Sequence, residues 1–532
     1  MVKQATPQTP MQSLRVYLIK KEVKKYKDAL RNDIPFDEHA ISSRHNIKGK
    51  LFVRKPEAKP VSWAKFLETG VDERLKLNSL AHAAVLFIET KQRMFAIVFG
   101  MGRYMLRDTK YVSDFGILSA LNLVDAKKVR SADTYQIDDV VINKRSQSSR
   151  NTSLGDHDLD PSRAHVRAIT GISSTDGLRG TVSGNDSGFG SNARIKFKEL
   201  ADHCRKALAA YNAKTYKTSF PRFDDFRTMS DKVKIEQLQE KLLRKLRSNR
   251  LAGVFLSPPE PISYDDFSGF SFSPKGDITT ELDIGQYVNS RKDLDDFTIE
   301  KLKADRVFLR TETSDEPLGK WSVYRSIICE IKERNKVYVL VNGAWHQVAA
   351  KFANRVRETI KGLAEVDLGL PAPQAATTEP EYMAEVESFG HGFIVLDRKL
   401  AKCEEAGHPI EICDIITKKR ELIHVKRKAG GSATFSHLFL QGRNSAFALL
   451  RDQQFRNEGR AHLQKIDKKE VKRIPKATPK PSTFKVIYAV MGDFKNKSFV
   501  DSLPFFSQMS LMAVAQELHE RGIAVELCKI QT

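Results

Sequence analysis

The segment 381–532 carries the most restrictive pattern in the sequence, because helical and strand-like runs follow one another in one order. The helical stretch EYMAEVES precedes three strand-like stretches, FIVLD, IEICDII and ELIHVKR. The helical SHLFLQGRNSAFALL, the strand-like TFKVIYAV, another helix and the strand-like IAVELCKI come next. The spacing of apolar residues separates the two types, with a period near 3.6 for helices and 2 for strands. This order predicts an α-β-β-β-α-β core with an added helix and strand.

The whole chain has 532 residues, which exceeds what one hydrophobic core organises, so we expect several units. The Pro- and Ala-rich LGLPAPQAATTEP is typical of a linker, and an Asn-Gly pair in VYVLVNGAWHQV is typical of a tight hairpin turn. We therefore predict a multidomain α+β protein. Its expected units are an N-terminal α/β domain (1–144), a Ser- and Gly-rich loop region (145–195), helices with a small antiparallel meander (196–365), a linker (366–380) and a C-terminal α/β domain (381–532).

The N-terminal third shows the same two periodicities. SLRVYLIKK predicts a strand and EVKKYKDALR a helix, while AHAAVLFIE and MFAIVFGMGRYML predict two strands joined by TKQR. In FGMGR there is neither a third glycine nor a Lys-Ser/Thr pair, so a bulge or turn is expected there rather than a phosphate loop. Helical spacing recurs in 197–211, 235–246 and 352–363.

Charge is the strongest compositional feature. There are 88 Lys and Arg against 66 Asp and Glu, a formal net charge of +22, and such an excess favours a polyanionic partner. No apolar run approaches the roughly 18 residues of a membrane span, and the N-terminus lacks the apolar centre of a signal peptide. We therefore expect a cytoplasmic protein that binds nucleic acid rather than a membrane. The five cysteines are scattered, which predicts buried thiols and no zinc site.

The strand-like ELIHVKR raises a chemical question, because His424 and Lys426 lie two residues apart and so share a face. If Thr417 pairs with Glu421 across a three-residue turn, Asp414 falls opposite His424. An acid, an imidazole and an ammonium then lie together, and each needs a partner. A two-residue turn would separate them.

The following helix adds a polar stripe in an otherwise apolar sequence. His437, Gln441 and Ser445 are spaced four residues apart, so they lie on one face. If that face is turned to the sheet, the stripe closes a polar pocket above the strands. If it is turned away, the three side chains are solvated.

These elements and residues resemble the PD-(D/E)XK restriction-endonuclease-like superfamily. The resemblance implies that Asp414 is a metal ligand, Lys426 the catalytic lysine and Gln441 the helix glutamine. It also implies an acid on the first helix, Glu385 or Glu387. The implied cofactor is a divalent metal, Mg²⁺ or Mn²⁺, which activates water and stabilises charge on the phosphate.

One position departs from that pattern, because His424 stands where the superfamily has a third-strand acid. Imidazole is a softer ligand than carboxylate, so a site built on Asp414 and His424 has an altered metal shell or binds nucleic acid without cutting it. Glu421 points to the opposite face. Glu411 or Asp397 replaces the missing acid if a bulge turns either one inward.

The whole chain also resembles, through FGMGR, SDFGILSALNLVD, ELIHVKR and SHLFLQG, a sporadically distributed family of bacterial proteins without an assigned activity. Members of that family are thought to travel with mobile or restriction-type genes. The resemblance implies a role in antiviral defence, with a homo-oligomer or a partner protein of a defence system as further expectations.

Basic residues around these motifs suit contact with phosphates. The expected nucleic-acid contacts are Lys418, Lys419, Arg420, Arg427, Lys428, His437 and Arg443. The leading hypothesis is metal-dependent hydrolysis of DNA by Asp414, His424, Lys426 and Gln441. The alternatives are a nucleic-acid binding or sensing module without catalysis, and an assembly scaffold in which the polar cluster is structural.

Overall fold

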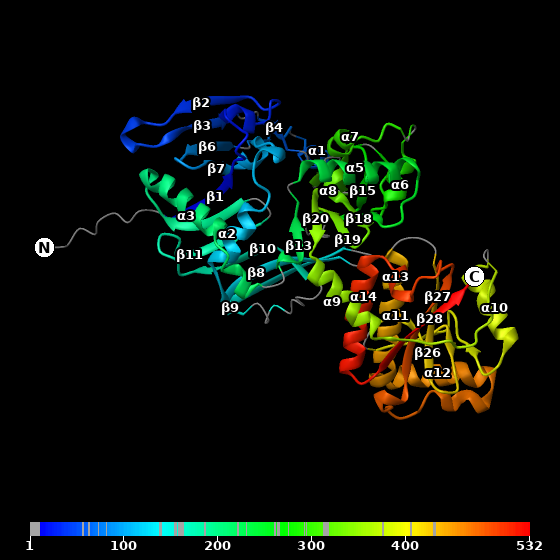
Figure 1. Cartoon of the computed structure of the whole chain (residues 1–532). Helices are drawn as coiled ribbons and strands as arrows, with labels where there is room; N and C mark the ends of the chain where they lie inside the picture. The colour runs from blue at the N-terminus through cyan, green and yellow to red at the C-terminus, as the bar shows by residue number, and fades with distance from the viewer. Residues whose placement is uncertain are drawn as a thin grey trace.

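A computed structural model describes residues 11–532 with short gaps and confirms a mixed α and β protein with several sheets (Figure 1). The residues outside the description are 1–10, 56–57, 62–63, 73, 81, 138–140, 154–156, 158–163, 186–187, 221–222, 230, 260–261, 263–266, 275, 292, 294, 312–318, 375–376, 405–406 and 429–431. The expectation about the N-terminus therefore falls largely outside it. Among the described residues, no helix combines the length and apolarity that crossing a bilayer demands. All five cysteines are buried thiols outside any disulfide, as expected.

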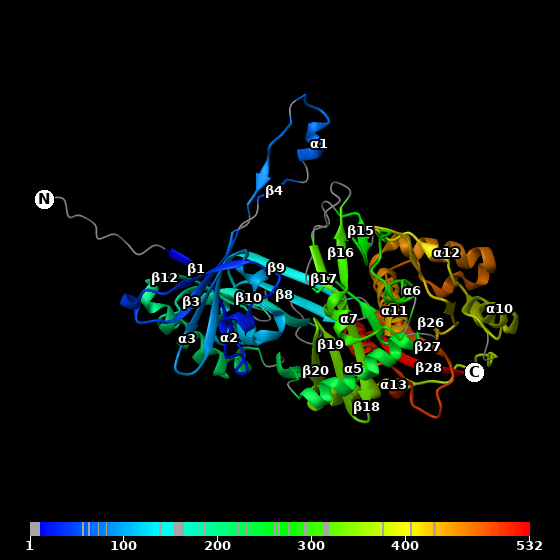
Figure 2. The ribbon, with the colours of Figure 1, turned by 90° about the horizontal axis from the view of Figure 1, so that it is seen from above.

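The first unit is a ten-stranded sheet in which every neighbouring pair is antiparallel. In spatial order its strands are β2 (Phe36–Ala40), β3 (Lys48–Arg54), β6 (Ala83–Glu89), β7 (Met94–Gly100), β1 (Met11–Leu18), β12 (Gly188–Arg194), β11 (Gly180–Gly184), β10 (Ala164–Ser173), β8 (Val124–Ile137) and β9 (Val141–Thr152). Helices α2 (Phe115–Leu123), α3 (Leu200–Asn212) and α4 (Tyr216–Ser219) belong to its core. A small excursion with β4 (Lys59–Pro60), α1 (Ala64–Glu68) and β5 (Asn78–Ser79) projects from it (Figure 2).

The prediction of a loop region over 145–195 was wrong, because most of this segment forms strands β9 to β12. Its glycines serve packing rather than flexibility. A Cβ on Gly184 would come within 2.0 Å of the carbonyl oxygen of Gly116 in α2, and one on Gly116 within 2.3 Å of that of Gly188. The helix thus lies directly on the strands, an approach that only glycine allows.

The predicted helix over residues 22–31 was also wrong. Only Tyr26–Ala29 is helical, and it forms a single 3-10 turn. Ala29 and Leu30 are buried, and Leu30 bridges to Leu106 as extended chain. Tertiary burial of this short segment overrides its helical propensity. In contrast, the two strands joined by TKQR pair as predicted, and a positive φ at Gly100 ends β7 before a 3-10 turn.

The second unit contains a five-stranded and a three-stranded sheet. The five strands, in order, are β13 (Phe226–Thr228), β20 (Ala344–Val348), β19 (Lys336–Val341), β18 (Ile327–Glu333) and β14 (Val254–Leu256), and the three are β15 (Gly269–Ser271), β16 (Arg306–Arg310) and β17 (Gly319–Ser322). Their helices are α5 (Lys232–Arg247), α6 (Ile284–Asn289), α7 (Ile299–Ala304), α8 (Val323–Ser326) and α9 (Ala350–Lys361). The expected meander is present. Asn342 and Gly343 take φ values of 51° and 75° in the turn between β19 and β20, as the Asn-Gly pair predicts.

The third unit is a six-stranded mixed sheet. Its strands, in order, are β21 (Ala364–Glu365), β28 (Ala524–Gln531), β27 (Lys485–Gly492), β26 (Glu421–Arg427), β25 (Ile415–Ile416) and β22 (Ile394–Val395), beside a separate pair of β23 (Leu400–Ala401) and β24 (Ile410–Glu411). The helices are α10 (Glu379–Phe389), α11 (Ser432–Arg451), α12 (Gln453–Ile466), α13 (Phe499–Ser502) and α14 (Phe505–Glu520). The predicted α-β-β-β-α-β order is confirmed. Strands β22, β25 and β26 are antiparallel, and β27 is parallel to β26.

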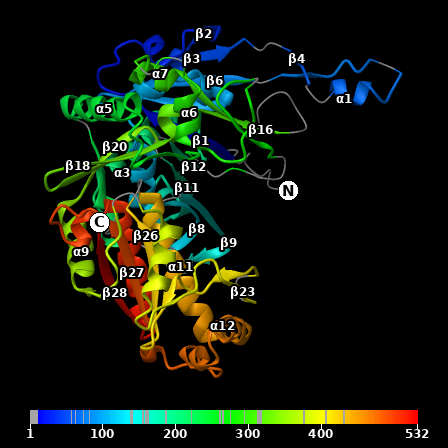
Figure 3. The same ribbon diagram turned by 90° about the vertical axis from the view of Figure 1, so that its right-hand side faces the viewer.

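Two faces of this sheet are covered by different helices. Val486, Tyr488 and Val490 of β27 share a core with α11 and α14, and Figure 3 shows α11 beside strands β26 to β28. Ile423 and Val425 of β26 share another core with α10. The first core continues into α9 and the strands of the meander, so the segment 366–380 connects parts that pack together.

A buried glutamate joins the second and third units. Glu330 in β18 lies at the start of α14, where its carboxylate oxygens accept hydrogen bonds from the amides of Phe505 (2.7 Å) and Phe506 (3.1 Å). These amides have no partner within their own helix. Burial raises the pKa of Glu330, although the two amides oppose the shift.

We predict that Glu330→Ala destabilises the protein by about 2–4 kcal/mol, because two buried amides lose their acceptor. Glu330→Gln, which keeps one acceptor, should lose less. The control is Glu333→Ala on the same strand, which removes ion pairs to Lys234 and Lys241 near the surface and should cost at most about 1 kcal/mol. Urea unfolding followed by circular dichroism measures the three values, and equal losses for Glu330→Ala and Glu333→Ala would contradict the capping role.

Candidate metal centre

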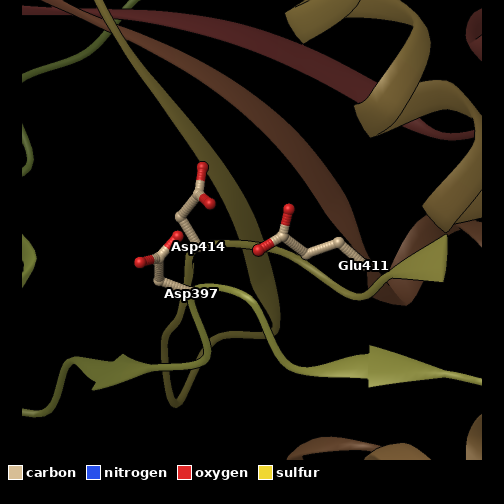
Figure 4. A group of neighbouring side chains, drawn as sticks. All are labelled: Asp397, Glu411 and Asp414. Carbon is tan, nitrogen blue, oxygen red and sulfur yellow. The ribbon is translucent and has the colours of Figure 1, made fainter. Parts of the chain in front are cut away.

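Three carboxylates meet at the end of the third unit where α10 begins. They belong to Asp397, which follows β22, Glu411, which ends β24, and Asp414, which precedes β25 (Figure 4). One oxygen from each lies within 4.8 Å of the other two. Asp414 is buried, whereas Asp397 and Glu411 are half-buried. This carboxylate cluster is the only group of its kind among the described residues.

An interruption of the second strand creates the cluster. In an unbroken strand, Glu411 and Asp414 would point to opposite faces, because they are three residues apart. Here Ile410–Glu411 pairs with Leu400–Ala401, whereas Ile415–Ile416 pairs with β22 and β26. The chain changes partners between the two short strands, and both acids turn to the same side. Glu411 and Asp397 therefore both lie beside Asp414, the position expected if either one turns inward.

Helix α11 fixes this interruption. The side-chain amide of Gln441 donates a hydrogen bond to the Glu411 carboxylate, and the hydroxyl of Ser445 donates to the carbonyl of Ile412. Two members of the predicted polar stripe therefore face the strands, as in the first of the two arrangements considered. His437, one turn earlier, is exposed.

The electrostatics of the cluster favour a bound cation. Burial raises the pKa of Asp414 to about 8; the charges of Glu411, Asp397 and Glu379 act in the same direction, and the backbone amide of Val425, 2.6 Å away, opposes it. Burial also raises the pKa of Glu411, with Asp397 adding to the shift. Neighbouring carboxylates that repel one another are stabilised when a cation joins them.

Lys426 is held by another acid, Glu379, whose charge also acts on Asp414. Its ammonium is 2.8 Å from the carboxylate of Glu379, whose other oxygen accepts a hydrogen bond of 2.9 Å from the amide of Arg427. Glu379 is the first residue of α10. Glu379 is therefore the acid of α10 that contacts Lys426, whereas the side chains of Glu385 and Glu387 are exposed.

His424 does not join the carboxylates. The predicted register is confirmed, because Ile415 pairs with Ile423 and Ile416 with Leu422, which leaves Asp414 opposite His424. The imidazole, however, is fully buried beside the ring of Tyr488, 6.3 Å away between centroids, and neither nitrogen has a hydrogen-bond partner in the described structure. Burial lowers its pKa to about 3. His424 therefore lies outside the group of three carboxylates that contains Asp414.

The basic residues predicted as nucleic-acid contacts are spread over the unit. Lys418, Lys419 and Arg420 form the turn before β26, and a rise of about 3.3 Å per residue places them roughly 20 Å from Lys426. Arg420 packs on Phe484, and Arg443 forms an ion pair with Glu517 (3.3 Å). The two that lie at the Lys426 end of the strand are Arg427 and Lys428.

The raised pKa of Asp414 predicts a pH dependence. Between pH 4 and 8 the folded state holds a proton that the unfolded state releases, so the free energy of unfolding falls as pH rises through this range. Relative to Asp414→Asn, wild type should lose at least about 1.4 kcal/mol between pH 5 and 8 in EDTA, the equivalent of one pKa unit. Millimolar Mn²⁺ should restore the stability of the wild-type protein but not that of Asp414→Asn.

Asp452→Asn is the control for this pH series. Asp452 is a buried carboxylate at the start of α12, where asparagine also caps well. Burial raises its pKa, but amide donors outweigh this and leave the pKa below its usual value, so its stabilising effect is lost as pH falls. Urea titrations at four pH values measure both effects. If the free energy of unfolding of wild type changed with pH in parallel with that of Asp414→Asn, the prediction of a buried proton on Asp414 would be contradicted.

A second prediction concerns His424. We expect His424→Leu to retain Mn²⁺ binding and to be at least as stable as wild type at pH 6, because two unpartnered buried nitrogens are removed. Glu411→Gln and Asp397→Asn should weaken Mn²⁺ binding by about tenfold or more. Isothermal titration calorimetry measures the affinities. If His424→Leu lost Mn²⁺ binding while Glu411→Gln kept it, the imidazole of His424 would be a metal ligand after all.

Comparison with known proteins identifies a family for this chain. No curated protein and no solved structure matches it. A family model matches residues 14–531, from the first strand of the ten-stranded sheet to the end of β28, and so includes the carboxylate cluster. The chain belongs to the family of unknown function DUF6119.

Proposed function

We propose that this protein is a metal-dependent nuclease that hydrolyses DNA phosphodiester bonds at the carboxylate cluster. The observation that carries the proposal is the convergence of Asp397, Glu411 and Asp414 at the interrupted second strand of an α-β-β-β-α-β core. The resemblance to PD-(D/E)XK enzymes supports it, since those enzymes place their acids at this point of the sheet. The net charge of +22 supports a polyanionic substrate.

The donor set fits a hard divalent cation. Asp397, Glu411 and Asp414 would hold the ion through oxygen atoms alone, which suits Mg²⁺ or Mn²⁺ better than Zn²⁺. When bound, such an ion polarises the phosphate and lowers the pKa of a coordinated water molecule. The buried position of Asp414 keeps competing water from one side of the cluster.

The chain's own residues supply the remaining functions. The Val425 amide fixes one oxygen of Asp414, and Gln441 orients Glu411. The Lys426 ammonium, about one-third exposed, provides positive charge for a phosphate oxygen beside the cluster. Glu379 sets the direction of this ammonium. A role in defence against foreign DNA follows from the second resemblance and forms part of the proposal.

Two observations favour a second candidate function, nucleic-acid binding without hydrolysis. His424 stands where the superfamily has a third-strand acid and is buried among apolar groups. Lys426 is already ion-paired, which reduces its freedom to contact a phosphate. This candidate predicts salt-dependent binding with no cleavage in any divalent metal.

We predict that wild type nicks supercoiled plasmid in Mg²⁺ or Mn²⁺ and that Asp414→Asn and Lys426→Ala reduce the rate by roughly 100-fold or more, the loss typical of removing one charge-stabilising group. The matched control is Lys485→Ala. Lys485 lies on the adjacent strand and is paired with Glu526 at 2.6 Å, as Lys426 is paired with Glu379, but it lies at the other end of the sheet.

Product formation on agarose gels over time measures these rates. Equal activity in wild type, Lys426→Ala and Lys485→Ala would sink the nuclease proposal. Retarded migration of the DNA without product in every metal would favour the binding function.

A further inference from the structure

Six basic side chains gather at the carboxyl end of the parallel strands β26 to β28, which the chain terminus marks in Figure 1. This group, called here the edge cluster, consists of Lys332, Arg357, Lys428, Lys495, Lys497 and Lys529. It combines side chains from β18 and α9 of the second unit with others from the third. Four of the six, the lysines other than Lys428, are exposed.

Lys497 lies at the centre of this group. Its charge acts on Lys428 and on Lys332, and its carbonyl oxygen accepts a hydrogen bond of 3.5 Å from Lys529. The ammonium groups of Lys428 and Lys529 both lie over the ring of Phe494, at 4.6 and 5.9 Å from its centre. The edge cluster is therefore one continuous patch that crosses the boundary between the two units.

The cations of the edge cluster repel one another. Burial lowers the pKa of Lys428, and Lys497 and Lys495 lower it further against the opposing charge of Asp493. Burial and then Arg357 and Lys497 lower the pKa of Lys332, against Asp501 and Glu330.

The acids at hand neutralise part of this charge. Glu365 pairs with Lys529 at 3.2 Å, Asp501 is 3.8 Å from Arg357, and Asp493 adjoins Lys428. Glu330 also acts on Lys332, so four carboxylates face six cations, and the remaining excess of positive charge favours a polyanion.

The loop that carries Lys495 and Lys497 has an unusual backbone. Lys495 and Asn496 are consecutive residues with φ values of 48° and 59°, a region that side-chain-bearing residues seldom occupy. Backbone of this kind is retained where surrounding contacts enforce it. Hydrogen bonds from the Lys497 amide to the Phe494 carbonyl (2.9 Å) and from the Lys495 amide to the Asp493 carboxylate (2.8 Å) close this turn.

The edge cluster adjoins the carboxylate cluster through one strand. Lys428 is two residues beyond Lys426 on the same chain, a separation of about 7 Å. Arg427 lies between them, with its amide bonded to Glu379. The basic turn at 418–420 is at the opposite end of β26. Positive charge is therefore concentrated on one side of the carboxylate cluster, toward Lys497.

We propose that the edge cluster binds the phosphate backbone of nucleic acid and directs it into the carboxylate cluster, across the boundary between the second and third units. The ligand is a run of phosphodiesters, as in duplex DNA. The part of this inference that directs nucleic acid into the carboxylate cluster rests on the proposed nuclease function. Phosphate binding by the edge cluster does not depend on cleavage. The turn 418–420, in spite of its three basic residues, lies off this path.

The test compares two matched double variants of the full chain. Lys495→Gln with Lys497→Gln removes two charges from the edge cluster, and Lys418→Gln with Lys419→Gln removes two exposed charges from the turn. Fluorescence anisotropy with a labelled 30-base-pair duplex, a single strand and an RNA duplex measures affinity in EDTA at several salt concentrations. Because EDTA prevents cleavage, this result is independent of the nicking assay.

We expect the edge variant to weaken duplex DNA binding by about tenfold or more and to reduce the slope of log affinity against log salt by about 1.8. The turn variant should change affinity by less than about twofold. Equal losses in the two variants, a loss in the turn variant alone, or no binding by wild type would overturn the proposal. Equal melting temperatures for both variants and wild type establish that folding is unchanged.

A nuclease that loses nicking in Asp414→Asn but binds DNA equally with and without the edge lysines would refute this inference and leave the proposed function standing. The reverse result, in which the edge lysines bind DNA and no metal supports nicking, would support phosphate binding and remove the nuclease proposal. Preference for the single strand or for RNA in the same titrations identifies the form of the backbone.

Discussion

The bond between the Val425 amide and the Asp414 carboxylate is the interaction on which the site depends. In a regular antiparallel pair, the Val425 amide would donate to a backbone carbonyl of the opposite strand. Here the side chain of Asp414 takes the place of that carbonyl, while the backbone carbonyl of Asp414 accepts from the amide of Leu396 at 2.7 Å. One aspartate thereby keeps β26 paired, attaches β22 and ends the regular strand beside Glu411. The geometry of the site and the irregularity of the sheet have the same cause.

Several features of the fold could be predicted because their signals are local. ELIHVKR is a strand over its full length, and a three-residue turn fixed the register that places Asp414 opposite His424. The helical spacing of apolar residues correctly predicts helices α3, α5, α9 and α11. The spacing of four residues between Gln441 and Ser445 in an apolar helix predicts a polar face, and Gln441 of this face contacts Glu411.

The missed features depend on contacts between distant segments. The strands of 145–195 have few apolar side chains, and they form because α2 lies against their glycines. Asp397 and Glu411 enter the site through a change of strand partners that alternation alone does not reveal. The titratable side chain of His424 predicts a chemical role, although the neutral imidazole is buried beside Tyr488. Glu379 could have been found from the Thr378 capping box, which marks where α10 begins.

The cap that Glu330 forms on α14 has a consequence for dissecting this protein. The paired residues are 175 positions apart, and the core around them contains Val339, Phe352 and Val356 from the second unit. A fragment that starts at residue 381 would expose the apolar surface of α14 and leave its first amides without acceptors. The linker-like sequence before α10 is thus a poor place to cut. A piece that keeps both this cap and the carboxylate cluster has to begin upstream of β18.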